Sequence, residues 1–150
     1  MGDDVKLKDV TADNWEAVVA LELAAGQQDL VASNLYSLAE SKFDPDARPR
    51  AVYAGDHVVG FLMYDVQQTK DRQRKASIYR FMIDRKHQRR GYGRVALASA
   101  LDEIRALPGM RKVSIRYMPD NLVAKPFYAS FGFREVGCDD DGEIIAELTL

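Results

Sequence analysis

The N-terminal part of the chain alternates between strand and helix patterns of apolar and polar side chains. Residues 5–10 alternate apolar with polar positions, which is typical of a half-buried strand. Apolar positions at helical spacing follow at residues 15–23, with Thr11 or Asp13 as a candidate helix cap. A second helix is expected at about residues 30–41.

The middle of the chain has the pattern of a β-hairpin and a further strand. Apolar segments at residues 51–54 and 58–64 flank Gly55-Asp56, which is a common turn signal, and so predict the hairpin. A polar turn at residues 67–74 separates this hairpin from a strongly apolar strand at residues 76–83.

Helices and strands continue in turn through the C-terminal half. The expected elements are a helix after residues 91–93, a strand at 113–117, a short helix at about 124–131 and two strands on either side of residues 141–142. Pro108-Gly109 ends the first helix, and Gly132 is a natural left-handed cap for the second. Because Pro126 fits only the first turn of a helix, the short helix should begin near Ala124. The order β-α-α-β-β-β-α-β-α-β-β predicts a mixed α/β (α+β) sheet in one domain that spans residues 1–150.

Composition and charge narrow the class of protein. The chain has 150 residues, 47% of them hydrophobic and 29% charged, and a net charge of -2, so its overall field does not attract nucleic acid. No run approaches the roughly 18 apolar residues of a membrane span, and the acidic start predicts no signal peptide. We therefore expect a cytoplasmic protein that binds neither a membrane nor nucleic acid. Cys138, the only cysteine, has no partner at metal-ligand spacing, so we predict no metal site and a buried structural thiol.

Candidate chemistry begins at residues 88–94, which lie between an apolar strand and a helix start. Gly91 and Gly93 allow the backbone to curl so that several N–H groups point at one anion, and the helix start adds partial positive charge. Basic side chains raise the local potential further: Arg85, Lys86, Arg89, Arg90 and Arg94. The segment therefore suits a pyrophosphate group.

Other interpretations apply to the same turn. A relaxed dinucleotide fingerprint, Gly91-x-Gly93-x-x-Ala96, needs an acidic residue about 20 positions further on, where Arg111 and Lys112 stand instead. A P-loop needs Gly-Lys-Ser/Thr, which the segment does not contain. A nucleic-acid patch would be short in an otherwise acidic chain. A solvated basic turn that only caps a helix also fits the segment taken alone.

A second group of residues follows further along the chain. Asn121, Ala124 and Tyr128 fall on one face of the expected short helix. Tyr128 could belong to the core, and its hydroxyl would then need a partner, which a cleft beside the preceding strand would provide. Core positions are expected at Phe127, Phe131 and Phe133.

Together these two segments resemble the signatures of the GNAT superfamily of N-acetyltransferases. The first signature, Gln/Arg-x-x-Gly-x-Gly/Ala after a strand, is met by Gln88, Gly91 and Gly93. The second, Asn…Ala…Tyr…Gly-Phe, is met by Asn121, Ala124, Tyr128, Gly132 and Phe133. The resemblance covers essentially the whole chain. It implies a seven-stranded mixed sheet with helices on both faces, a splayed central pair of strands, and acetyl-CoA as co-substrate.

The resemblance also implies roles for particular residues. The cofactor would enter between the splayed strands, near Met82 and Tyr117, and the amine would attack the acetyl group directly in a ternary complex. Tyr128 would be the general acid toward the leaving thiolate. The general base stays open between Glu22, Glu40 and a chain of waters. The implied cofactor-binding residues are Phe81, Met82, Ile83, Gln88, Arg89, Arg90, Gly91, Tyr92, Gly93, Arg94 and Asn121.

The acceptor is suggested by residues 28–39, 59–64 and 79–84, which look like those of the bacterial spermine/spermidine acetyltransferases of the BltD type. A primary amine of a polyamine is therefore expected, and a homodimer is one assembly that the resemblance allows. The alternatives are another small amine, a protein substrate, or a non-catalytic acetyl-CoA sensor, against which an intact Tyr128 argues. Candidate substrate residues are Glu22, Gln28, Asn34 and Glu40, with further acids at Asp29, Asp44 and Asp46.

Overall fold

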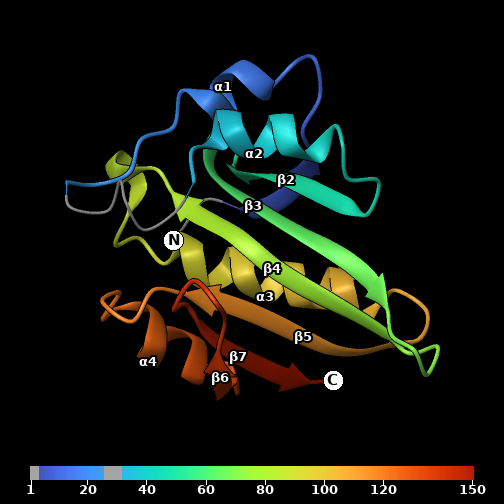
Figure 1. Cartoon of the computed structure of the whole chain (residues 1–150). Helices are drawn as coiled ribbons and strands as arrows, with labels where there is room; N and C mark the ends of the chain where they lie inside the picture. Colours follow the sequence, from blue (N-terminus) through green and yellow to red (C-terminus); the bar gives the residue numbers. More distant parts are fainter. Residues whose placement is uncertain (1–3, 26–31) are drawn as a thin grey trace.

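The computed structural model describes residues 4–25 and 32–150. In this part of the chain, seven strands form one mixed sheet in the spatial order β1-β2-β3-β4-β5-β7-β6 (Figure 1). The β4/β5 pair is parallel and the other neighbouring pairs are antiparallel. Along the chain, strands and α-helices follow one another in the order expected from the sequence. The strands are β1 (Val5–Asp9), β2 (Ala47–Ala54), β3 (His57–Gln68), β4 (Arg74–Ile83), β5 (Met110–Tyr117), β6 (Arg134–Cys138) and β7 (Ile144–Thr149). The helices are α1 (Trp15–Val19), α2 (Asn34–Ser41), α3 (Tyr92–Arg105) and α4 (Ala124–Ala129), with a short 3-10 helix η1 (Arg85–His87) before α3.

Helices cover both faces of the sheet, as the expected fold class requires (Figure 1). On one face, α3 places Leu97 and Ile104 in a core with β3, β4 and β5, and α4 adds aromatic side chains to the same core. On the other face, α1 places Val18 and α2 places Leu38 against the sheet. None of the helices in the described part of the chain has the length and apolar character to cross a membrane.

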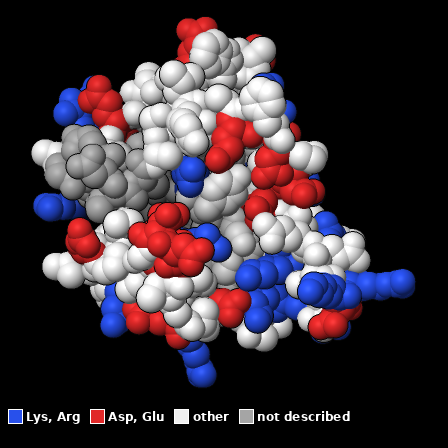
Figure 2. All heavy atoms as spheres, in the orientation of Figure 1, with Lys and Arg blue, Asp and Glu red and all other residues white. Residues whose placement is uncertain are grey.

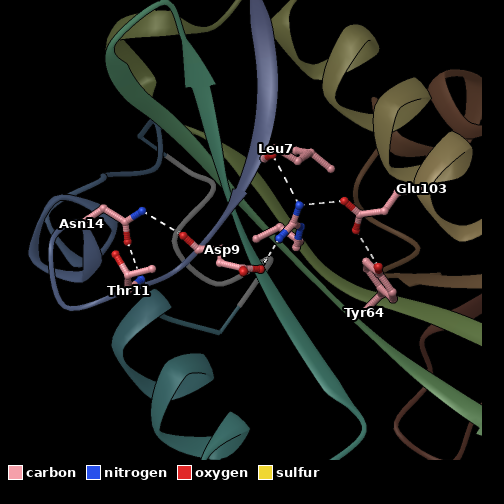
Figure 3. Close-up of polar contacts among 7 residues, drawn as sticks. Leu7, Asp9, Thr11, Asn14, Tyr64 and Glu103 are labelled. Atoms are coloured by element: carbon pink, nitrogen blue, oxygen red, sulfur yellow. Dashed lines mark hydrogen bonds and ion pairs between the residues drawn. The ribbon is translucent and has the colours of Figure 1, made fainter.

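The helix α1 is shorter than expected, and Leu21 and Leu23 follow it outside the helix. Both side chains still pack against the sheet, so the helical spacing of these apolar residues does not require a helix there. The cap position is Asn14, and its side chain accepts a hydrogen bond from the Thr11 N–H at 2.8 Å (Figure 3). The expected caps, Thr11 or Asp13, are therefore wrong.

Two other elements begin at unexpected residues. The helix α2 begins at Asn34 because Ser33 caps it, with Ser33 Oγ accepting from the Tyr36 N–H at 3.1 Å. Part of the segment expected before it lies outside the described residues. The strand β2 begins at Ala47 and includes Pro49, whereas the expected strand covered only residues 51–54. Pro49 is tolerated because the β1 pairing reaches only Arg50, so no strand on that side needs its missing N–H.

Cys138 is exposed, and the expectation of a buried structural thiol is wrong. The residue ends β6, which is the outermost strand on its side of the sheet. All five residues of β6 are exposed. The position of the strand at the edge of the sheet therefore decides the environment of this cysteine.

A charged network joins α3 to the first three strands (Figure 3). Glu103 on α3 accepts hydrogen bonds from Arg50 Nη2 at 2.7 Å and from the Tyr64 hydroxyl at 2.6 Å. Arg50 also pairs with Asp9 and donates to the Leu7 carbonyl oxygen at 3.4 Å. Only 16% of the Arg50 side chain is exposed, so its charge depends on these partners.

We expect Glu103→Ala to lower the free energy of unfolding by about 1–3 kcal/mol, because Arg50 and Tyr64 would each lose a partner in a largely buried place. Urea denaturation measures the change. The neighbouring Asp102 is the control: it is 80% exposed, and its ion pair with Arg105 has a length of 3.4 Å. Asp102→Ala should cost less than about 0.5 kcal/mol. Equal losses in the two variants would contradict the role of Glu103.

Candidate active site

Pairing between the central strands β4 and β5 stops partway along them. Ile78 and Arg80 of β4 pair with consecutive residues of β3, which leaves Tyr79 as a β-bulge without an opposite residue. On the other side of β4, the pairing with β5 ends at Ile78 and Ile115. Because a bulge bends its strand and increases the local twist, the rest of β4 is directed away from β5.

A cleft of about 280 Å³ opens where this pairing ends. Residues 78–83 of β4 line one side, and Arg116 and Tyr117 of β5 line the other. The turn before α3 and the start of α4 complete the walls. This is the splayed strand pair, near Met82 and Tyr117, that the resemblance implies. Within residues 4–25 and 32–150, the main chain of β4 beyond Ile78 has no partner strand on this side, so it can pair with an extended ligand.

The turn between η1 and α3 has the conformation of an anion-binding loop. Arg89 has a φ of 65° and Gly91 a φ of 81°, both in the left-handed region, and Gly91 is the cap of α3. Left-handed residues in such a turn direct successive N–H groups toward one point. Gln88 Nε2 donates to the Ile83 carbonyl oxygen at 2.9 Å, which ties the turn to the end of β4. The geometry of the turn therefore suits a phosphate-bearing ligand.

Tyr128 lines the cleft from α4. Its ring stacks on Tyr117 with the centroids 5.7 Å apart and makes edge contacts with Phe127 and Phe133. Burial first, and then the neighbouring Tyr117, raise the pKa of Tyr128, so the hydroxyl stays protonated well above neutral pH. No group in residues 4–25 or 32–150 hydrogen-bonds to this hydroxyl, which leaves it available to a ligand.

The bulge places two consecutive side chains of β4 on the face that α2 covers. Tyr79 packs in the apolar cluster of that face. Arg80 donates to Ser37 Oγ at 3.0 Å, and its guanidinium lies 3.5 Å from the Glu40 carboxylate. The same guanidinium lies over the Tyr79 ring, 5.1 Å from the ring centroid. Glu40, a candidate substrate residue, is therefore tied to an arginine that lines the cleft.

Carboxylates lie beside Tyr79 on this face, and Figure 2 shows acidic side chains close to α2 as one of several acidic groups in this view. Burial first, and then the charges of Asp65, Glu40 and Asp44, raise the pKa of Tyr79 to about 12. The Tyr79 hydroxyl and one carboxylate oxygen of Asp65 are buried without a hydrogen-bond partner. Within the described residues, Asp44, Asp46 and Asp65 form no ion pair, and the charges of Asp44 and Asp65 act on Tyr79, which lines the cleft although the three carboxylates themselves do not.

A second cavity, of about 380 Å³, lies between α1, α2 and the end of β4. It shares Leu23 and Met82 with the cleft. Two candidate substrate residues line it. Glu22 pairs with Arg85 at 3.0 Å, and the buried Asn34 donates to a backbone carbonyl of α1 at 2.9 Å. Both side chains therefore already have protein partners.

Most of the expected cofactor-binding residues line the cleft: Phe81, Met82, Ile83, Gln88, Arg89, Gly91, Tyr92, Gly93 and Asn121. Two expected residues, Arg90 and Arg94, are not part of the cleft lining in the described part of the chain. Arg94 instead contacts residues just after α4: it donates to Ser130 Oγ at 2.9 Å and lies over the Phe131 ring, 4.9 Å from the ring centroid. Of the acceptor-side expectations, Gln28 and Asp29 lie outside the described residues.

Sequence reasoning did not single out Tyr79, Arg80 or Arg116 as site residues. The first two have a local signal: apolar residues alternate up to Ile78 but resume at Phe81, so the spacing slips by one position at the bulge. Arg116 has no such signal. Its ion pair with Asp139, at 3.4 Å, joins two residues that the sheet brings together from distant parts of the sequence.

The cleft, the turn and α4 together define the class of protein. The family model described as Acetyltransferase (GNAT) family matches residues 15–133, which contain all three. The chain therefore belongs to the GNAT family, and it is an acetyl-CoA-dependent acetyltransferase. Acetyl-CoA is its co-substrate.

Known proteins similar to this chain agree with that assignment. The spermine/spermidine N(1)-acetyltransferase of Bacillus subtilis is 27% identical over 143 residues, which cover 93% of this chain and 94% of the relative. The crystal structure of an acetyltransferase from Thermus thermophilus matches with a TM-score of 0.74 and 22% identity, over 100% of both chains. The PaiA N-acetyltransferase of Thermoplasma acidophilum, solved in complex with coenzyme A, matches with a TM-score of 0.74 and 15% identity, over 98% of this chain and 99% of that one. At these identities the two structures establish the fold.

Proposed function

We propose that this protein transfers the acetyl group of acetyl-CoA to a primary amine of a polyamine such as spermidine or spermine. The observation that carries the choice of acceptor is the group of carboxylates whose charges act on Tyr79 of the cleft lining: Glu40, Asp44 and Asp65, of which Asp44 and Asp65 form no ion pair within the described residues. The charges that raise the pKa of Tyr79 also stabilise a cation placed beside it. A polyamine has several ammonium groups, so one can lie at this edge while another amine reacts. The name of the Bacillus subtilis relative supports the same acceptor.

Binding of the donor would use the backbone on β4 and the turn before α3. The main chain of residues 81–83, which has no partner strand on the cleft side in the described part of the chain, would pair with the pantetheine arm as an added strand does. The left-handed turn at Arg89 and Gly91 and the N-terminus of α3 would hold the pyrophosphate through N–H groups. Asn121 and Tyr128 line the same cleft from the other side. Bound in this way, acetyl-CoA supplies an activated acetyl group as a thioester.

The residues of the cleft would then promote the transfer in two ways. A backbone N–H of β4 would stabilise the negative charge that develops on the carbonyl oxygen, a contribution of about 3–4 kcal/mol. Tyr128 would donate its proton toward the leaving sulfur, a role worth roughly 10²–10⁴-fold in rate. Its raised pKa keeps the proton on the hydroxyl over the working pH range. Holding the amine beside the thioester removes entropy that otherwise opposes the reaction.

The acceptor must also lose a proton before it attacks. Glu22 and Glu40, the two carboxylates considered as the base, pair with Arg85 and Arg80. Neither is a free carboxylate facing the cleft. We therefore assign deprotonation of the amine to solvent water, with direct attack in a ternary complex.

Gly91→Glu should weaken acetyl-CoA binding by more than about tenfold, because a carboxylate at this position opposes the pyrophosphate. Calorimetric titration measures the affinity. Gly55→Glu is a matched control: Gly55 has a φ of 60°, a Cβ there also meets nothing within 4 Å, and it lies in the β2–β3 turn. The control should bind acetyl-CoA as the wild type does. Unchanged affinity in a folded Gly91→Glu variant would contradict the proposed phosphate site.

Tyr128→Phe should lower kcat by about 100-fold or more and change the affinity for acetyl-CoA little, because only the proton donor is lost. In the wild type, kcat/KM should rise with pH as the amine, with a pKa near 10, loses its proton. Since burial raises the pKa of Tyr128, loss of its proton should not lower the rate below about pH 10. Steady-state kinetics across pH tests both statements. A wild-type kcat in Tyr128→Phe at every pH would show that the hydroxyl has no catalytic role.

Spermidine should give a higher kcat/KM than an amine of similar length with an uncharged tail. The difference should shrink in high salt, because the screening length for exposed charges, about 8 Å at physiological ionic strength, becomes shorter as salt is added. Asp44→Asn combined with Asp46→Asn should lower kcat/KM for spermidine and leave the uncharged-tail amine unaffected. Asp102→Asn removes an acid that is 80% exposed on α3 and should change neither value. Equal kcat/KM values for the two amines, with no salt dependence, would leave the acetyltransferase assignment intact and contradict the proposal that a polyamine is the acceptor.

A further inference from the structure

A tyrosine and a carboxylate from non-neighbouring strands meet beside Tyr128. The Tyr117 hydroxyl of β5 donates to Glu135 Oε1 of β6 at 2.9 Å, and β7 lies between these two strands in the sheet. In the sheet, Glu135 pairs with Ala146 of β7, which in turn pairs with Ile115 of β5. Tyr117 is 7% exposed. Burial first, and then Glu135, raise the pKa of Tyr117 to about 12, so its hydroxyl remains the donor.

Tyr128 depends on this pair for its position. The rings of Tyr117 and Tyr128 stack with an angle of 27° between their planes. Lys125, one turn before Tyr128 on α4, lies 3.6 Å from the same Glu135 carboxylate. The Tyr128 hydroxyl makes no hydrogen bond with any described group, so ring packing alone orients it. Glu135 is therefore joined both to the ring that supports Tyr128 and to the helix that carries it.

We propose that Glu135 and Tyr117 are positioning residues for Tyr128: their hydrogen bond fixes the Tyr117 ring, and the stacked rings pass this orientation to the Tyr128 phenol. The inference rests on the proposed acid role of Tyr128. Tyr117 lines the cleft, but its hydroxyl proton is directed to Glu135, so it acts through its ring. Placement matters because a shift of about 1 Å in a reacting group can cost up to about 100-fold in rate.

Tyr117→Phe is the direct test, because it keeps the ring and removes only the hydrogen bond. We expect kcat to fall by about tenfold while KM for acetyl-CoA changes less than about twofold. Release of coenzyme A is followed with the best amine from an acceptor screen, so the identity of the amine does not decide the result. In a Tyr128→Phe background the same substitution should cause no further fall, because its effect passes through the Tyr128 hydroxyl.

Glu135 supplies an independent variant, since it is on the surface with 40% of its side chain exposed and its loss should not prevent folding. Glu135→Ala should match Tyr117→Phe, and Glu135→Gln, which keeps an acceptor oxygen, should restore most of kcat. Tyr64→Phe is the matched control. It also removes a tyrosine–glutamate hydrogen bond, at 2.6 Å to Glu103, but outside the cleft lining, so it should lower thermal stability at an unchanged kcat.

An equal fall of kcat on Tyr117→Phe in both backgrounds would overturn the inference, because the effect would then not pass through Tyr128. An unchanged kcat in Tyr117→Phe and Glu135→Ala, beside an impaired Tyr128→Phe, would overturn it as well. A wild-type kcat in Tyr128→Phe alone would remove the acid role and this inference together. That result would leave the polyamine acceptor to be judged by its own test.

Discussion

The end of pairing between β4 and β5 is the constraint on which the rest of the site depends. Unpaired backbone groups in the middle of a sheet cost free energy, so strands rarely part there without something to fill the gap. The chain keeps the opening because the outer contacts of both strands continue past it: β3 pairs with β4 as far as Ile83, and β7 pairs with β5 as far as Tyr117. Each strand is held from its far side, and the cleft between them is left for an extended ligand.

The β-bulge at Tyr79 determines which side chains of β4 line the cleft on the side of α2. A regular strand would direct Tyr79 and Arg80 to opposite faces, whereas the extra residue turns both toward α2. The arginines on the two lips of the cleft are each matched by a carboxylate, Arg80 by Glu40 and Arg116 by Asp139. With these pairs formed, Asp44 and Asp65 are carboxylates that act on Tyr79 and have no ion pair within the described residues. Which charges are paired therefore determines the electrostatic environment of Tyr79.

Two tyrosine–glutamate hydrogen bonds in this fold illustrate different uses of one interaction. The bond from Tyr64 to Glu103 joins the sheet to α3 in a network with Arg50, and its effect is on stability. The bond from Tyr117 to Glu135 joins strands of one sheet and lies under an aromatic ring at the cleft. In our proposal its effect is on the orientation of the acid rather than on the fold. The difference comes from what packs on each tyrosine.

Local patterns in the sequence determined the order of the elements and the glycine turn that opens α3, because alternation, helical spacing and turn residues are properties of neighbouring positions. Even the bulge left a trace, in the slip of apolar spacing between Ile78 and Phe81. Only the tertiary structure decided that Cys138 is exposed, which carboxylates pair with which arginines, and that Tyr117 reaches Glu135. The exposure of Cys138 and the Tyr117–Glu135 contact depend on the strand order β5-β7-β6 and on the register across it, whereas the Arg80–Glu40 pair depends on the bulge in β4 and on the packing of α2. Register between distant strands is set when their buried faces pack together, and no spacing along a single strand contains it.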